Sequence, residues 1–165
     1  MRYSLVSFEE SDFEGREFVH EIKLGDGRFY YVLEENRPYL KVEVDTKQLF
    51  DDAVVFNKHL LIGLFDEIIF INLLDFNIKR FEVEMYFGRF EIYKDFMYIL
   101  VGNGIIAFDT NLNEVWRNLS LAVDGVSLIE IINDEIMSLS CEMDPPGGWV
   151  DKLIDIKSGE IILEN

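Results

Sequence analysis

Short apolar runs separated by polar turns recur along the chain, and each run has the length of a β-strand. In the clearest example, the apolar run 96–101 is followed by Gly102-Asn103-Gly104 and by a second run, 105–108. A third run, 114–119, follows a polar corner at 109–113. Runs of about five residues joined by glycine- and asparagine-rich turns are typical of an antiparallel meander. The pattern therefore predicts an all-β fold built from antiparallel meanders.

The first 50 residues carry the same pattern and predict four strands joined as hairpins. Gly25-Asp26-Gly27 and Asn36-Arg37-Pro38 separate neighbouring runs, and these residue types favour tight turns. The alternation in 41–44 indicates a strand with one solvent-facing side. The four expected strands are 2–8, 17–24, 28–34 and 39–45. We expect this N-terminal meander, residues 1–50, to cap the rest of the fold.

From residue 51 onward the sequence repeats itself at a spacing of about 40 residues. A shift of 37 positions places residues 57–72 on 94–109 without a gap. A shift of 39 positions places 91–100 on 130–139. Several short strands per copy at this spacing are typical of propeller blades, in which each copy is one small sheet packed against its neighbours.

The last copy is longer than the others. Residues 154–162 match 108–116 at a shift of 46, so this copy contains seven additional residues. They must lie near 141–149, where the sequence reads CEMDPPGGW. The insertion therefore interrupts a repeat at a defined point.

The repeat resembles that of quinoprotein-like β-propellers. The likeness rests on Gly102-Asn103-Gly104, on Ala107-Phe108-Asp109-Thr110 and on Val115-Trp116 after the polar turn. The segment 153–162 resembles the same repeat, with Gly159 at its turn. The resemblance covers roughly residues 51–165 and implies a propeller-like architecture. It implies no particular function, because such folds carry both enzymes and scaffolds.

The length of the chain limits the size of any ring. Closed propellers have roughly four to eight blades, and 165 residues provide four at most. We expect a single domain, 1–165, in which the N-terminal meander caps three imperfect blade-like repeats at 51–165. These sheets form either an irregular four-sheet ring or an open arc. We expect no cofactor, because the quinone site of such propellers needs a full ring.

The net charge of −17 is the strongest global feature. Residues 101–165 alone carry 12 acidic and 3 basic residues. Such a field repels nucleic acid and anionic membranes, and it favours encounter with basic proteins. Acidity also keeps an apolar, strand-rich chain soluble, so this interpretation stands beside the first.

Compartment signals are few. No apolar run approaches the ~18 residues of a membrane-spanning helix. The N-terminus is acidic where a signal peptide would be apolar. Cys141 is the only cysteine, which excludes an internal disulfide. We predict a cytoplasmic protein without a membrane association.

Catalytic and metal-binding motifs are weak. The two histidines, His20 and His59, lie near no serine or cysteine motif, and we expect a surface and a partly buried structural position, respectively. Residues 109–113 resemble the start of a calcium loop, but Glu114 and Ser120 replace the required glycine and glutamate. Asp109 is better explained as a corner residue that accepts backbone N–H groups. We therefore predict no metal site and no enzyme.

The insertion carries the candidate binding residues. It is stiffened by two prolines and places Trp149 beside acidic residues, and tryptophan is common among interface anchors. The predicted binding residues are Glu142, Asp144, Trp149 and Asp151. In the alternative, Trp149 folds back and caps the apolar end of the sheet.

Three functions remain open at this point. The first is a non-enzymatic acidic protein that binds a basic protein partner, for example an immunity-type toxin inhibitor. The second is a propeller-like scaffold that self-associates. The third is a carboxylate-dependent hydrolase, which would need two acids converging in one pocket.

Overall fold

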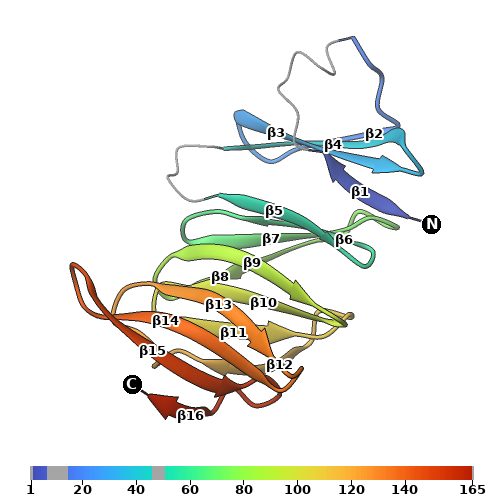
Figure 1. The fold of residues 1–165 in the computed structure, drawn as a ribbon. Helices are drawn as coiled ribbons and strands as arrows, with labels where there is room; N and C mark the ends of the chain where they lie inside the picture. The colour runs from blue at the N-terminus through green and yellow to red at the C-terminus, as the bar shows by residue number, and fades with distance from the viewer. Residues whose placement is uncertain (1, 7–14, 46–50, 165) are drawn as a thin grey trace.

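Four sheets of four strands each are stacked along the molecule in this computed structural model (Figure 1). The structure describes residues 2–6, 15–45 and 51–164. We name the sheets A to D in chain order. Sheet A contains β1 (Tyr3–Val6), β2 (His20–Lys23), β3 (Gly27–Glu34) and β4 (Arg37–Asp45). Sheet B contains β5 (Asp52–Phe56), β6 (His59–Gly63), β7 (Glu67–Asn72) and β8 (Ile78–Glu82).

The other two sheets come from the second half of the chain. Sheet C contains β9 (Phe87–Tyr93), β10 (Phe96–Val101), β11 (Gly104–Phe108) and β12 (Glu114–Asn118). Sheet D contains β13 (Val126–Ile132), β14 (Ile136–Asp144), β15 (Gly148–Asp155) and β16 (Ile161–Glu164). The all-β, propeller-like fold class is confirmed. Within the described residues, no helix has the length and apolar character of a membrane span.

Sheets B, C and D are antiparallel meanders whose strands lie side by side in sequence order. The repeat has a direct structural meaning, because β6 and β7 occupy the places in sheet B that β10 and β11 occupy in sheet C. Leu60 pairs with Ile71, and the residues 37 positions later, Met97 and Phe108, pair in the same way. The internal repeat therefore marks successive sheets.

An aspartate corner recurs at the same point of the last two repeats. Asp109 Oδ1 accepts the backbone N–H groups of Asn111 and Asn113 at 2.8 and 2.9 Å. Asp155 Oδ1 accepts those of Lys157 and Ser158 at 2.8 and 2.9 Å. These hydrogen bonds lower the pKa of both carboxyl groups, for Asp109 chiefly those from Asn113. The corner role predicted for Asp109 is confirmed.

Sheet A departs from the predicted hairpin order. Its strand order is β1-β3-β4-β2, and β2 runs parallel to β4 at the edge instead of pairing with β3. The predicted Gly25-Asp26-Gly27 hairpin is therefore wrong, because the chain crosses the end of β4 there. A Cβ on Gly25 would overlap the backbone nitrogen of Asp45, so the crossing needs a residue without a side chain.

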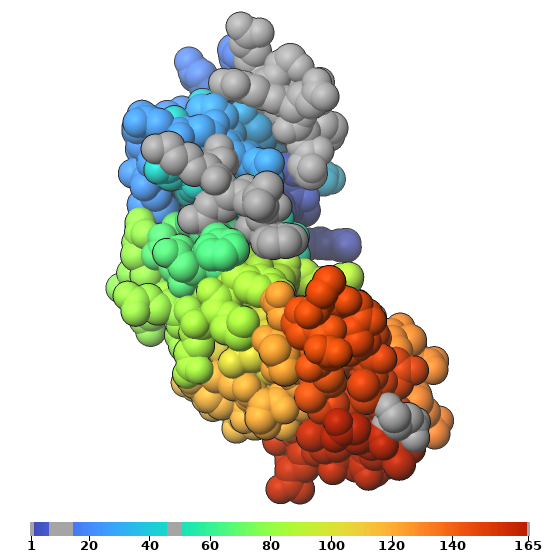
Figure 2. Space-filling model, turned by 90° about the vertical axis from the view of Figure 1, so that its left-hand side faces the viewer, coloured from blue at the N-terminus to red at the C-terminus, as the bar shows by residue number. Residues whose placement is uncertain are grey.

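Apolar side chains fill the three spaces between successive sheets. Leu40 and Ile69 belong to the cluster between sheets A and B. Phe87 and Ile99 belong to that between B and C, and Leu139 lies between C and D. Among the described residues, no such cluster joins sheet A to sheet D. Figures 1 and 2 show these two sheets at opposite ends of a curved, elongated molecule. Of the two predicted arrangements, the structure shows the open arc.

The two ends of the arc differ. On the outer face of sheet A, the ring of Phe18 stacks on that of Tyr31 at 5.3 Å, and Tyr31 is only 2% exposed. On sheet D, by contrast, the edge strand β16 is exposed along its whole length. The edge of sheet D is therefore open to solvent.

Candidate functional site on the β14–β15 hairpin

The additional residues of the last repeat lengthen one hairpin. β14 has nine residues and β15 has eight, and their pairing extends from Ile136–Asp155 to Asp144–Gly148. The tip of this hairpin reaches beyond the neighbouring strands at the left of Figure 1. The insertion is thus built on a paired, regular element and not on a free loop.

The hairpin brings three of the four predicted binding residues onto one face. Glu142 pairs with Trp149, and Asp151 lies two positions further along β15, on the same side of the sheet. The opposite side is buried against sheet C, as Cys141 and Lys152 show. Asp144 lies at the tip, after a register shift that separates it from Glu142.

Trp149 is packed at one edge of its ring and exposed over the rest. Its ring end lies 3.2 Å from the position that a Cβ would take on Gly125, so one part of the indole packs against that backbone. The side chain is nevertheless 50% exposed. Gly125 has a φ of 110°, a conformation that favours glycine. The tryptophan is therefore anchored at one edge and open to solvent over the rest.

Glu142 has an internal role that the sequence did not predict. Its Oε1 accepts the backbone N–H of Gly147 at 2.5 Å, across the turn of the hairpin. Nearby, Tyr86 donates its hydroxyl to Asp124 Oδ1 at 2.6 Å. Burial, followed by this hydrogen bond, raises the pKa of Tyr86 to about 12. Glu142 thus stabilises the shape of the tip.

The remaining acids leave the outer face negative. Asp144 and Asp151 are exposed, and no ion pair found within the described segments involves either of them. The nearest basic residue on these strands, Lys152, points into the core and pairs with Glu164 at 3.2 Å. The outer face therefore presents Trp149 with the uncompensated carboxylate of Asp151, and Asp144 adds an unpaired carboxylate at the tip.

The two histidines and the cysteine pack against other side chains of the fold. His20, expected at the surface, is half-buried because the rings of Tyr39 and Phe76 lie 5.2 and 4.3 Å from it. His59, expected to be partly buried, is buried with 8% exposure. Cys141 is fully buried, and burial raises the pKa of its thiol to about 11. Across the described residues, no group of three or more histidine, cysteine or acidic side chains is arranged to bind a metal.

Two hollows lie away from the hairpin. One, of about 400 Å³, is lined by Asp66, Glu67, Glu82 and Val83. Asp66 and Glu82 are exposed, and Glu67 pairs with Arg80 at 2.5 Å. A catalytic acid needs shielding from solvent to keep its proton, so these three acids do not suit a carboxylate-dependent hydrolase.

The other hollow, of about 370 Å³, lies between sheets B and C. Sequence reasoning missed it; its one signal was the basic pair at positions 79 and 80.

The comparisons with known proteins identify the fold. No protein-family model and no curated protein sequence matches the chain. Among solved structures, hydrazine synthase from Kuenenia stuttgartiensis matches 88% of this chain with a TM-score of 0.55 and 15% identity. KlHsv2 with loop 6CD replaced by a Gly-Ser linker matches 82% with a TM-score of 0.56 and 10% identity. BamB from Moraxella catarrhalis matches 87% with a TM-score of 0.52 and 11% identity.

These three proteins are β-propellers, which supports the propeller-like part of the resemblance seen in the sequence. The chain spans 48%, 45% and 47% of their chains, about half of each. At this identity the likeness concerns the fold alone. That the repeat is of the quinoprotein-like type stays a prediction.

Proposed function

We propose that this chain is a non-enzymatic interaction module that binds a basic protein through the outer face of sheet D. The observation that carries the proposal is Trp149, which is half-exposed, anchored on Gly125, and on the same face as the unpaired carboxylate of Asp151. A rigid aromatic side chain costs little conformational entropy on binding, and surrounding charges select the partner. The net charge of −17 adds long-range attraction for a cationic surface.

A finer version of this proposal is an immunity-type inhibitor. Such a protein covers the cationic site of a basic toxin, often a nuclease. Support comes from the small size, the acidic charge and the exposed acids beside Trp149. If the captured partner is a nuclease, an equimolar amount of this chain should suppress its activity.

Capture from lysate tests the role of the hairpin. Replacing Trp149 by alanine together with Asp151 by asparagine should weaken binding of the captured protein at least about tenfold, because the anchor and one charge are lost. The matched control replaces Asp95 by asparagine, an exposed acid in the β9–β10 turn of sheet C. The measurement is quantitative mass spectrometry of bound proteins at low and high salt.

The capture experiment has outcomes that support the proposal and outcomes that contradict it. A basic protein that is released by salt, lost with the hairpin variant and kept by the control supports the proposal. Equal capture by the wild type and the hairpin variant contradicts it, as does capture dominated by acidic or uncharged proteins without salt dependence.

A second candidate function, self-association, is favoured by strand β16. Among the described residues this edge strand pairs with β15 alone, and Ile161, Ile162 and Leu163 are 41%, 54% and 46% exposed. An exposed apolar edge strand is a ready template for pairing with another strand. A scaffold assembled from several copies would cover it.

Light scattering tests whether the chain self-associates. If β16 mediates assembly, the wild-type chain should form dimers or larger species at micromolar concentration. Replacing Ile162 by lysine should return it to a monomer, because a charge on the edge opposes strand pairing. A wild-type chain that is already monomeric at that concentration excludes the scaffold.

A further inference from the structure

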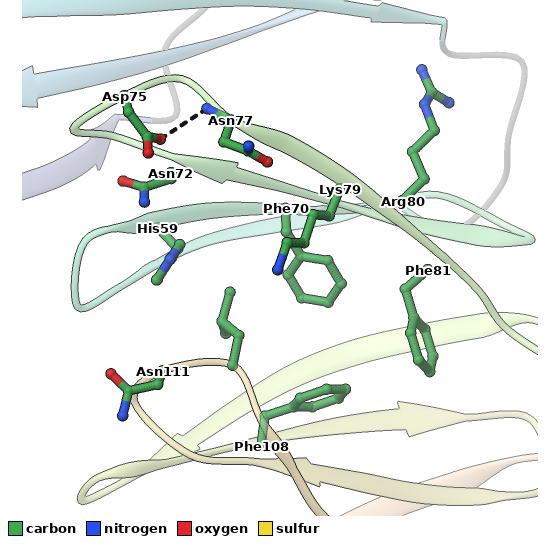
Figure 3. Close-up of a pocket in the computed structure, with 11 residues that line it drawn as sticks. His59, Phe70, Asn72, Asp75, Asn77, Lys79, Arg80, Phe81, Phe108 and Asn111 are labelled. Carbon is green, nitrogen blue, oxygen red and sulfur yellow. Dashed lines mark hydrogen bonds between the residues drawn. The ribbon is translucent and has the colours of Figure 1, made fainter.

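The cavity between sheets B and C has an apolar wall made of three phenylalanines. The ring centroids of Phe70 and Phe108 are 6.0 Å apart, and those of Phe81 and Phe108 are 5.8 Å apart at an angle of 87°. Phe70 and Phe108 are 7% and 4% exposed, so their rings are held by the core. Figure 3 shows Phe70, Phe81 and Phe108 around the same space. This wall offers a preformed surface for another apolar ring.

The polar side of the cavity consists mainly of hydrogen-bond donors. Asn72 Oδ1 already accepts the N–H of Leu74 at 2.9 Å, which leaves its amide NH₂ free to donate. Asn111 lies at the facing corner, on sheet C. Asp75 is the one acid of the lining, and its carboxylate accepts the N–H of Asn77 at 3.0 Å.

Two basic residues lie on β8, but they point in different directions. In Figure 3 the amine of Lys79 lies beside Phe70 and within the cavity, whereas Arg80 extends away. Arg80 pairs with Glu67 at 2.5 Å. For Lys79, the described part of the chain contains no ion pair. Lys79 is thus an uncompensated cation in a protein with an excess of acids.

His59 adds a buried polar group to the same wall. Its side chain is 8% exposed, and its Nδ1 has no hydrogen-bond partner in the described structure. Burial first, and then the charges of Lys58 and Lys79, lower its pKa below the usual 6.5. The imidazole is therefore neutral at pH 7 and keeps unused hydrogen-bonding capacity without adding charge.

We propose that this cavity binds a small aromatic carboxylate. The ring of such a ligand packs on the partly buried Phe81 and on the exposed edges of Phe70 and Phe108, and its carboxylate is neutralised by Lys79 and hydrogen-bonded by the asparagine amides. A volume of about 370 Å³ accommodates a one-ring acid. The site lies at the opposite end of the strands from Trp149, since His59 begins β6 whereas Tyr86 and Gly125 adjoin the far ends of the sheets. It is independent of the proposed protein-binding face.

Calorimetric titration with three ligands that share one ring tests the charge preference. We expect phenylacetate to bind with a dissociation constant below about 10 mM, the neutral phenylacetamide at least about tenfold more weakly, and phenethylamine not at all. Tight binding of the amine would overturn the proposal, because the site would then select cations. Failure of phenylacetate to bind at this concentration would overturn it as well.

Two matched variants test the assigned residues. Lys79→Gln should weaken phenylacetate binding at least about tenfold and leave phenylacetamide unchanged. Lys157→Gln removes the same charge from an exposed corner of sheet D and should bind phenylacetate as the wild type does. Equal affinity of Lys79→Gln and wild type would overturn the proposal. Both positions are exposed, and the urea midpoint of each variant confirms that it is folded.

Discussion

Replacing Gly63 by alanine should lower the free energy of unfolding by about 1–3 kcal/mol. A Cβ at this position would overlap the ring of Phe87, which is fully buried between sheets B and C. That ring also packs on Phe90, with centroids 4.7 Å apart, so it has little room to move. In sheet C the corresponding position is Leu100, which shows that the repeat itself tolerates a large residue there. The midpoint of urea unfolding measures the loss.

A double-mutant cycle separates this overlap from a general effect on β6. Phe87→Leu alone should destabilise the chain by leaving a cavity. The double variant should lose less free energy of unfolding than the sum of the losses of the two single variants. Strictly additive losses would contradict the assigned contact.

The sequence pattern was sufficient for the part of the fold that depends on local chemistry. Strands could be read from apolar runs, and corners such as that of Asp109 could be read because an aspartate side chain closes its own turn. The repeat then indicated which strands occupy equivalent places in successive sheets. These features lie within about 40 residues of one another, so a single copy of the repeat contains them.

Sheet A was predicted less well because its strand order depends on contacts that the local sequence does not specify. A Gly-Asp-Gly segment suits a hairpin equally well as a crossing, and only the close approach of Gly25 to Asp45 identifies the crossing. For a similar reason, the sequence did not decide between a closed ring and an open arc. Strand pattern determines each sheet, whereas ring closure depends on how the end sheets meet.

For the candidate sites, too, the sequence indicated the local features but not the contacts that depend on packing. The insertion identified the hairpin that carries Trp149, but the bond between Glu142 and Gly147 depends on the turn geometry. The phenylalanine-lined cavity was missed because its residues come from three separate segments between His59 and Leu112. None of these segments carries a motif by itself, and only the packing of sheet B on sheet C brings them together.

Removing the carboxylate partner of a buried lysine should have the second large effect on stability. Lys152 is 2% exposed and pairs with Glu164 at 3.2 Å on the edge strand β16. Glu164→Gln should lower the free energy of unfolding by about 1–3 kcal/mol, because a buried cation loses its partner. Glu160→Gln, at an exposed position just before β16, provides the control with the same charge change and should have no effect.

Replacing the lysine itself should be tolerated, since a buried ion pair that gives way to an apolar side chain of similar size is often neutral or stabilising. We therefore expect Lys152→Met to unfold at a urea concentration equal to or above that of the wild type. In the Lys152→Met chain, Glu164→Gln should leave the free energy of unfolding unchanged, because no buried charge remains to be compensated. If Glu164→Gln destabilises both backgrounds equally, the glutamate acts through β16 pairing and not through Lys152.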